Sequence, residues 1–180
     1  MQKLIIFFVV MLFFFPSIAQ PTHFVTDKEK KYKEVKEHIT KEEYAFAYTA
    51  VKELKTMYPE NMASNHNYIN EDVDFFYVLC GLKLMQEPAK NEAINYIASV
   101  TNEPRRQLIS FHLAHYYFLN DDYLNAVEYF SRSGYDNLSN EQIADAKFEK
   151  AYSLFNLKRF AEAKPLFNEI QQVQENKYYI

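Results

Sequence analysis

The strongest constraint in this sequence is a spacing that occurs three times. In each occurrence a small residue is followed twelve positions later by alanine and, four positions after that, by a bulky apolar residue. The three sets are Gly81, Ala93 and Ile97; Ala114, Ala126 and Phe130; and Ala151, Ala163 and Phe167. Small residues at facing positions let two antiparallel helices approach to about 8 to 10 Å between their axes. The spacing therefore predicts successive pairs of packed helices, which is an internal repeat.

Composition and helix-end signals favour helices along the whole chain. Only 2 of the 180 residues are Gly and 6 are Pro, which is few for a many-stranded sheet, and 48% apolar content is ample for a core. Ser139 and Gln142 have capping-box spacing, Gly134 suits a helix C-terminus and Pro104 suits a first helical turn. We therefore predict an all-α fold. The expected helices are 28–39, 42–57, 72–87, 90–100, 104–120, 122–133, 140–157 and 159–173.

Two of the repeated segments resemble the tetratricopeptide repeat. They are residues 114–126, AHYYFLNDDYLNA, and residues 151–163, AYSLFNLKRFAEA. The alanines at 93, 126 and 163 lie 33 and 37 residues apart, on either side of the 34-residue period of that family. The pattern of Tyr44, Ala47, Val51, Leu54 and Pro59 resembles the second helix of a further, degenerate unit in which Val35 replaces the small first-helix residue.

This resemblance implies a right-handed α-solenoid of about four helical hairpins over residues 28–180. The hairpins would cover 28–59, 72–101, 104–134 and 140–174. Because solenoids normally finish with a polar capping helix, the apolar ending at Tyr178, Tyr179 and Ile180 leaves open a longer array or a docking edge. The resemblance implies protein binding rather than catalysis. A helical repeat nevertheless specifies the fold far better than the function.

The first 19 residues have the pattern of a secretory signal peptide. Lys3 precedes an apolar run from Leu4 to Phe15, and Ser17 and Ala19 stand at the positions expected before a cleavage site. A retained membrane anchor is the alternative, but an anchor needs about 20 apolar residues and this run has 12. We expect cleavage after Ala19, a short N-terminal extension at 20–27, no membrane insertion afterwards, and export to a periplasm or to the outside.

Sequence motifs for catalysis or cofactor binding are absent. Gly81 and Gly134 are isolated from each other, so neither a phosphate-binding loop, a dinucleotide fingerprint nor a nucleophile elbow can be written. His112 and His115 would share one helix face, but no third ligand at a useful spacing accompanies them to hold zinc. We expect no enzyme activity, no cofactor and no metal. The single cysteine, Cys80, lacks an intramolecular partner and is expected to be buried.

The charged clusters have structural explanations. Glu42-Glu43 and Asp121-Asp122 fall at expected helix starts, where carboxylates meet the helix dipole favourably. The alternating Lys and Glu residues of 28–36 are typical of a solvated helix face, and Arg105-Arg106 of a surface pair. The formal net charge is -4 and no basic face emerges, so nucleic acid is not an expected partner.

The resemblance also implies a concave groove lined by the first helix of each hairpin. The residues expected to face a protein or peptide partner there are Val78, Leu82, Met85, Phe111, His115, Phe118, Phe148, Tyr152 and Phe155. These side chains predict an apolar, aromatic surface with few fixed charges, suited to an extended or helical peptide. The Lys and Asn residues with which some tetratricopeptide proteins clamp a terminal carboxylate are missing from these positions.

Two alternatives to a groove-binding adaptor remain open from the sequence. In the first, the chain is the N-terminal section of a longer solenoid, or a subunit of a homo-oligomer joined through its C-terminal edge. In the second, the chain is a regulatory segment of an enzyme whose catalytic residues lie beyond Ile180.

Overall fold

The computed structural model describes residues 22–57 and 68–170, and within these ranges the chain forms helices and no strand. The prediction of an all-α fold is therefore confirmed. The signal peptide at 1–19, the link around Pro59 and residues 171–180 lie outside the described residues. The helices are α2 (Thr22–Thr40), α3 (Tyr44–Thr56), α4 (Tyr68–Lys83), α5 (Ala89–Ser99), α6 (Glu103–Leu119), α7 (Tyr123–Ser133), α8 (Asn140–Asn156) and α9 (Phe160–Ile170).

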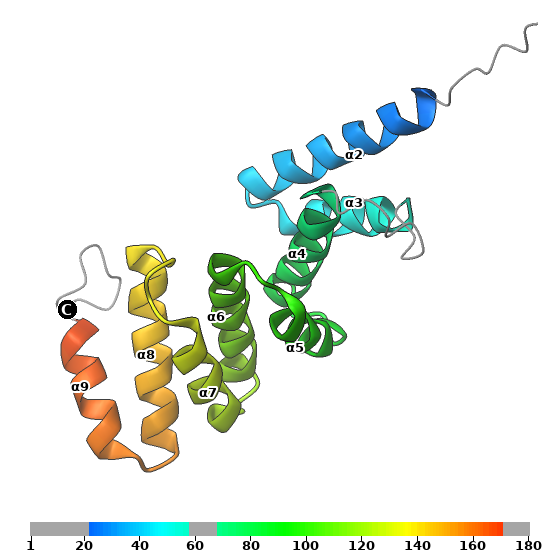
Figure 1. The fold of residues 1–180 in the computed structure, drawn as a ribbon. Coiled ribbons are helices and arrows are strands. Elements are labelled where there is room, and N and C mark those ends of the chain that lie inside the picture. The colour runs from blue at the N-terminus through cyan, green and yellow to red at the C-terminus, as the bar shows by residue number, and fades with distance from the viewer. Residues whose placement is uncertain (1–21, 58–67, 171–180) are drawn as a thin grey trace, which may run out of the picture.

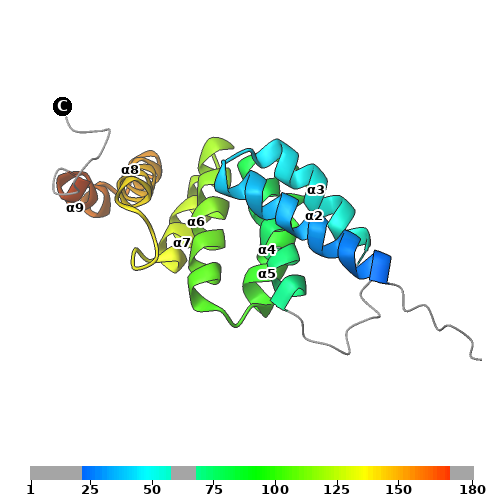
Figure 2. The ribbon, with the colours of Figure 1, turned by 90° about the horizontal axis from the view of Figure 1, so that it is seen from above.

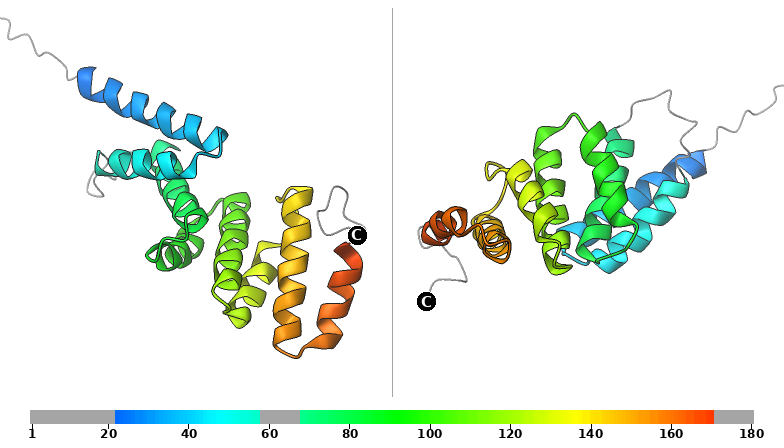
Figure 3. Two further views of the ribbon diagram at one scale, coloured as in Figure 1. Left: turned by 180° about the vertical axis from the view of Figure 1, so that it is seen from behind. Right: turned by 90° about the horizontal axis from the view of Figure 1, so that it is seen from below.

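The helices pack in chain order as four hairpins. α2 contacts α3, α4 contacts α5, α6 contacts α7 and α8 contacts α9, while α4 with α6 and α6 with α8 join successive hairpins directly. Figure 1 shows α6, α8 and α9 running side by side, with the α2–α3 hairpin at the far end of the row. The view from above in Figure 2 also places α2–α3 and α8–α9 at opposite ends, with α4 to α7 between them, and Figure 3 shows the same order from behind and below.

The same turn closes each hairpin. Its central residue has a left-handed backbone, and the next residue donates its N–H to the carbonyl five positions earlier, which is the Schellman arrangement. The left-handed residues are Glu42 (φ 57°), Met85 (φ 53°), Asp121 (φ 58°) and Lys158 (φ 62°). The corresponding N···O distances are 2.9 Å for Glu43 to His38, 2.9 Å for Gln86 to Gly81, 3.0 Å for Asp122 to Tyr117 and 2.8 Å for Arg159 to Leu154.

Local side chains begin and end several helices as the sequence predicts. Ser139 and Gln142 form a complete capping box at the start of α8, and Asp122 caps α7 by accepting from the Asn125 N–H. Pro104 lies in the first turn of α6, and Gly134 ends α7 with a left-handed φ of 59°. The side chains of Ser139, Gln142 and Asp122 pair with backbone N–H groups that the helix start would leave unpaired, and Pro104 has no N–H to pair.

Within the described residues two helices differ from their predicted limits by more than two residues, while the predicted end of α9 at 173 lies outside them. α2 begins at Thr22, so most of the expected extension at 20–27 is helical; after Pro21 no Gly or Pro interrupts the sequence before this helix ends. α4 was expected over 72–87 but spans Tyr68–Lys83. Its end is earlier because the chain turns left-handed at Met85, where no glycine marks the change. Helices α3, α5, α6, α7 and α8 agree with prediction to within two residues at each end.

The core is a series of buried clusters along the row. The largest joins α4 to α8 and contains the fully buried Ile109, Leu113 and Phe130. A second cluster joins α2, α3 and α4, and a third joins α7, α8 and α9. Cys80 is buried and unpaired as expected, and this burial raises the pKa of its thiol to about 12.

The small residues that define the repeat are buried, but the second hairpin has a different register from the others. A Cβ on Gly81 would meet the Cβ of Ala89 at 2.9 Å, so Ala89 rather than Ala93 is the close neighbour across the hairpin. The left-handed residue follows Ala114 and Ala151 by seven positions (121 − 114 and 158 − 151) but follows Gly81 by four (85 − 81). Val78 therefore stands where Ala114 and Ala151 stand in the later hairpins.

Candidate functional site

The structure separates the nine predicted groove residues into groups. Leu82, Met85, Phe111 and His115 line one pocket. Tyr152 forms ring contacts with both Phe118 and Phe148, and Phe155 packs against Phe160. Val78 is buried in the core. The expected continuous row is thus a pocket followed by an aromatic cluster towards the C-terminal hairpin.

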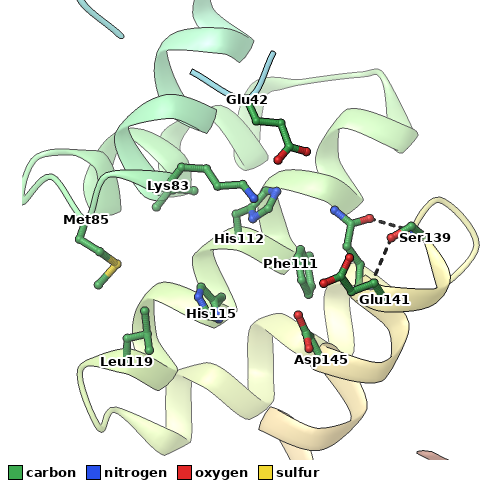
Figure 4. Close-up of a pocket in the computed structure, with 12 residues that line it drawn as sticks. Glu42, Lys83, Met85, Phe111, His112, His115, Leu119, Ser139, Glu141 and Asp145 are labelled. Carbon is green, nitrogen blue, oxygen red and sulfur yellow. Dashed lines mark hydrogen bonds between the residues drawn. The ribbon is translucent and has the colours of Figure 1, made fainter. Parts of the chain in front are cut away.

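The pocket lies between the C-terminal end of α4, the middle of α6, the first turns of α8 and the α2–α3 turn, with a volume of about 450 Å³. Figure 4 shows side chains from all of these elements facing a common space. Leu82 and Phe111 are buried, so they form its apolar floor, while Met85 and the exposed Leu119 lie on one side. The buried pair would touch a ligand only at the bottom of the pocket.

Charged residues make up much of the pocket lining, which corrects the expectation of few fixed charges. The carboxylates are those of Glu42, Glu141 and Asp145, and the ammonium is that of Lys83. Glu42 comes from a hairpin turn, and Glu141 and Asp145 come from the first two turns of α8. The predicted positions lay in the middle and last turns of the first helices, whereas the α2–α3 turn and the start of α8 also reach this space. Acidic residues are favoured at such helix starts by the helix dipole.

His112 is the buried polar residue of the pocket. Its side chain lies beside the Phe111 ring with the centroids 4.9 Å apart, and the whole residue is only 6% exposed. Within 22–57 and 68–170, neither ring nitrogen has a hydrogen-bond partner. Burial, with smaller contributions from Lys83 and His115, holds the pKa of His112 well below its usual value of 6.5. The imidazole is therefore neutral at pH 7, with one donor and one acceptor nitrogen.

His115, three residues further along α6, has a different environment. Its Nδ1 lies 2.8 Å from each carboxylate oxygen of Glu149 on α8, whose side chain is only 7% exposed. This pair links α6 to α8 along the pocket wall and fixes the orientation of the imidazole. No cluster of three or more His, Cys, Asp or Glu residues suited to a metal occurs within the described part of the chain.

The aromatic cluster lies next to an exposed apolar edge. Tyr152 is 41% exposed and has ring-centroid distances of 5.8 Å to Phe118 and 6.2 Å to both Tyr123 and Phe148. Phe155 and Phe160 are more than half exposed, with centroids 5.2 Å apart. These residues lie near the α6–α7 and α8–α9 turns, so the apolar surface predicted for a partner is most accessible at this end.

The other charged candidates serve the fold. The guanidinium of Arg105 pairs with Asp72 and lies over the Phe75 ring, whereas Arg106 donates to the Val100 carbonyl at 2.8 Å. In the Lys-rich first helix, Lys31 lies 2.7 Å from Glu53 of α3. No helix within 22–57 or 68–170 combines the length and apolarity needed to cross a bilayer.

Three charged residues of the pocket were not among the nine predicted groove residues, namely Lys83, Glu141 and Asp145. Lys83 is the last residue of α4, and its ammonium lies 5.0 Å from the centroid of the Tyr44 ring. Glu141 and Asp145 are four residues apart, which places both on one face of α8. The four-residue spacing predicts an acidic face on α8. Which hairpin that face approaches depends on packing between hairpins, which the spacing does not specify.

Comparison with known proteins gives no relative from which a function could be transferred. No protein-family model matches the sequence, and no curated protein gives a significant match. Function is therefore inferred from the pocket, the exposed edge and the sequence.

Proposed function

We propose that this protein is a non-catalytic, exported adaptor, built as a right-handed tetratricopeptide-like solenoid, that holds a segment of a partner polypeptide. The observation that carries the proposal is the 450 Å³ pocket between α4, α6 and α8, which gathers four of the nine residues expected to face a partner. Its volume falls within the range of about 300 to 1,000 Å³ that is usual for ligand sites. The first helices of three hairpins meet there, as the family resemblance implies for a concave surface.

Repetition in the chain supports the solenoid. Four hairpins close with the same left-handed turn, and α4, α6 and α8 follow one another in direct contact. Export is supported by the signal-peptide pattern of residues 1–19, and the periplasm of a double-membraned bacterium is the proposed destination.

Site-specific photo-crosslinking would test binding in the pocket. A photoreactive amino acid replaces Met85 in the pocket or, as a control, the exposed Lys164 on α9, and each variant is irradiated in an envelope extract of the source organism. We expect a discrete crosslinked polypeptide from position 85 and none from position 164. Identical products from both positions, or none from position 85, would refute the proposed site. Truncating Phe111 would be a poor test because its burial makes a loss of stability unavoidable.

Self-association is the second candidate function, and the exposed apolar edge favours it. The large exposed side chains at this end are Leu119, Leu124, Tyr152, Phe155 and Phe160. Contiguous exposed apolar surface commonly marks a protein interface. If copies join here, light scattering should give a dimer that the Phe155→Ser/Phe160→Ser variant converts to a monomer; a wild-type monomer at high concentration would eliminate this function.

A further inference from the structure

Charge and burial in the pocket indicate what kind of segment it binds, an inference that rests on the proposed function. Three carboxylates, those of Glu42, Glu141 and Asp145, face one ammonium, that of Lys83. His112 is neutral because its pKa is held low, and it adds no positive charge. Figure 4 shows the carboxylates of Glu141 and Asp145 on the α8 side of the space and Lys83 with His112 on the other side. The pocket lining is therefore acidic on balance.

The buried imidazole gives a second, independent indication of a ligand. His112 is 94% buried (100 − 6), lines the pocket and has no hydrogen-bond partner within the described residues. The ring nitrogens are not among the fully buried, unpartnered side-chain atoms of the described residues, so they open onto the pocket that the ring lines. Since a neutral imidazole keeps an acceptor nitrogen, a ligand that donates a hydrogen bond at the pocket floor would satisfy this group.

We propose that the pocket accepts an arginine side chain, flanked by apolar residues, from the partner polypeptide. A guanidinium has five N–H donors and no acceptor, so it can meet two carboxylates and an imidazole acceptor at once. Glu141 and Asp145 lie one helical turn apart on α8 and can share one guanidinium. The aliphatic stem of the arginine packs on Leu82 and Phe111, which form the apolar floor.

A randomised peptide library displayed on phage and selected on the full-length exported protein tests this inference. We expect the selected peptides to be enriched in arginine with apolar neighbours. Replacing that arginine by citrulline, which has nearly the same shape but no charge, should weaken binding at least about tenfold. The Glu141→Gln/Asp145→Asn variant should cause a similar loss, since two partly exposed ion pairs together contribute about this much. Glu128→Gln, an exposed carboxylate on α7 outside the pocket, is the control and should bind normally.

The outcomes separate this inference from the proposed function. If the selected peptides lack arginine but bind a Met85→Asp variant more weakly than the wild type, the pocket is the binding site and the arginine assignment is wrong. The same conclusion follows if arginine peptides bind the Glu141→Gln/Asp145→Asn variant as well as they bind the wild type. Failure to select any peptide sensitive to pocket variants would overturn both. Circular dichroism of each variant confirms that it is folded before binding is compared.

Discussion

Gly81 offers the sharpest test of how the helices approach one another. An alanine Cβ at this position would lie 2.9 Å from the Ala89 Cβ and 3.6 Å from Cε2 of Tyr48. Favourable contact between carbon atoms begins at about 3.5 to 4.0 Å, so α4 and α5 would have to move apart by roughly half an ångström or more. Ala89 has no flexible side chain that could turn away, and its own Cα is 3.9 Å from the new atom. The strain would therefore fall on the backbone packing of the second hairpin.

Two opposing effects set the magnitude for Gly81→Ala. Replacing glycine by alanine inside a helix stabilises it by about 1 kcal/mol, whereas overpacking a buried contact costs about 1 to 3 kcal/mol. We expect a net loss of about 0 to 2 kcal/mol in the free energy of unfolding. In an Ala89→Gly background the clash is removed, so the same substitution should become stabilising. The double-mutant cycle should give a coupling energy of about 1 to 3 kcal/mol.

Urea unfolding followed by circular dichroism measures all four proteins of the cycle. Ala98→Gly, at an exposed position in α5, calibrates the effect of helix propensity without a packing change. Close approach of α4 and α5 would be refuted if Gly81→Ala stabilised the protein by the full 1 kcal/mol and showed no coupling to Ala89.

Four further outcomes follow from local features. Lys158→Gly should stabilise the protein by about 0.5 to 1 kcal/mol in thermal unfolding, because Lys158 is left-handed (φ 62°) and glycine adopts this backbone without penalty. Ser139→Ala should lower the unfolding free energy by about 1 kcal/mol through loss of the capping box. The pKa of His112 is held well below 6.5 in the folded protein, so the unfolded chain takes up a proton that the folded one does not. The free energy of unfolding should therefore fall as the pH drops below about 6.5. His112→Gln should make the free energy of unfolding less dependent on pH in this range. The Cys80 thiol, with a pKa of about 12, should react with Ellman's reagent at pH 8 only after unfolding, and rapid reaction of the native protein would contradict its burial.

The helical architecture was predictable because its signals are local. Ser139 and Gln142 begin α8, Asp122 begins α7 and Gly134 ends it, and each signal involves residues within one turn of the helix end. The second hairpin was harder to predict because Val78 holds the position that alanine holds in the two later hairpins. The repeat was therefore aligned on the small residue Gly81, three positions later, and α4 was extended past its true end.

The pocket was only partly predictable because it depends on contacts between hairpins. Leu82, Met85, Phe111 and His115 were expected on its surface, and the structure brings these four together. Their exposure could not be inferred from the repeat, since it depends on how closely α4 packs against α6. Glu141 and Asp145 share a face of α8 with Phe148 and Tyr152 but lie nearer the start of the helix, and the predicted groove positions began at Phe148. A pattern within one hairpin carries no information about which end of the next hairpin approaches it.

Asp72, on α4, accepts a hydrogen bond from the Tyr32 hydroxyl of α2 and pairs with the Arg105 guanidinium of α6. One carboxylate thereby joins the first three hairpins, although a linear array normally transmits stability only from each unit to the next. The unfolding of the N-terminal hairpin would remove a partner from a carboxylate that still has to hold α6. Loss of the first hairpin therefore weakens a contact of the third, and we expect the first three hairpins to unfold as one cooperative unit.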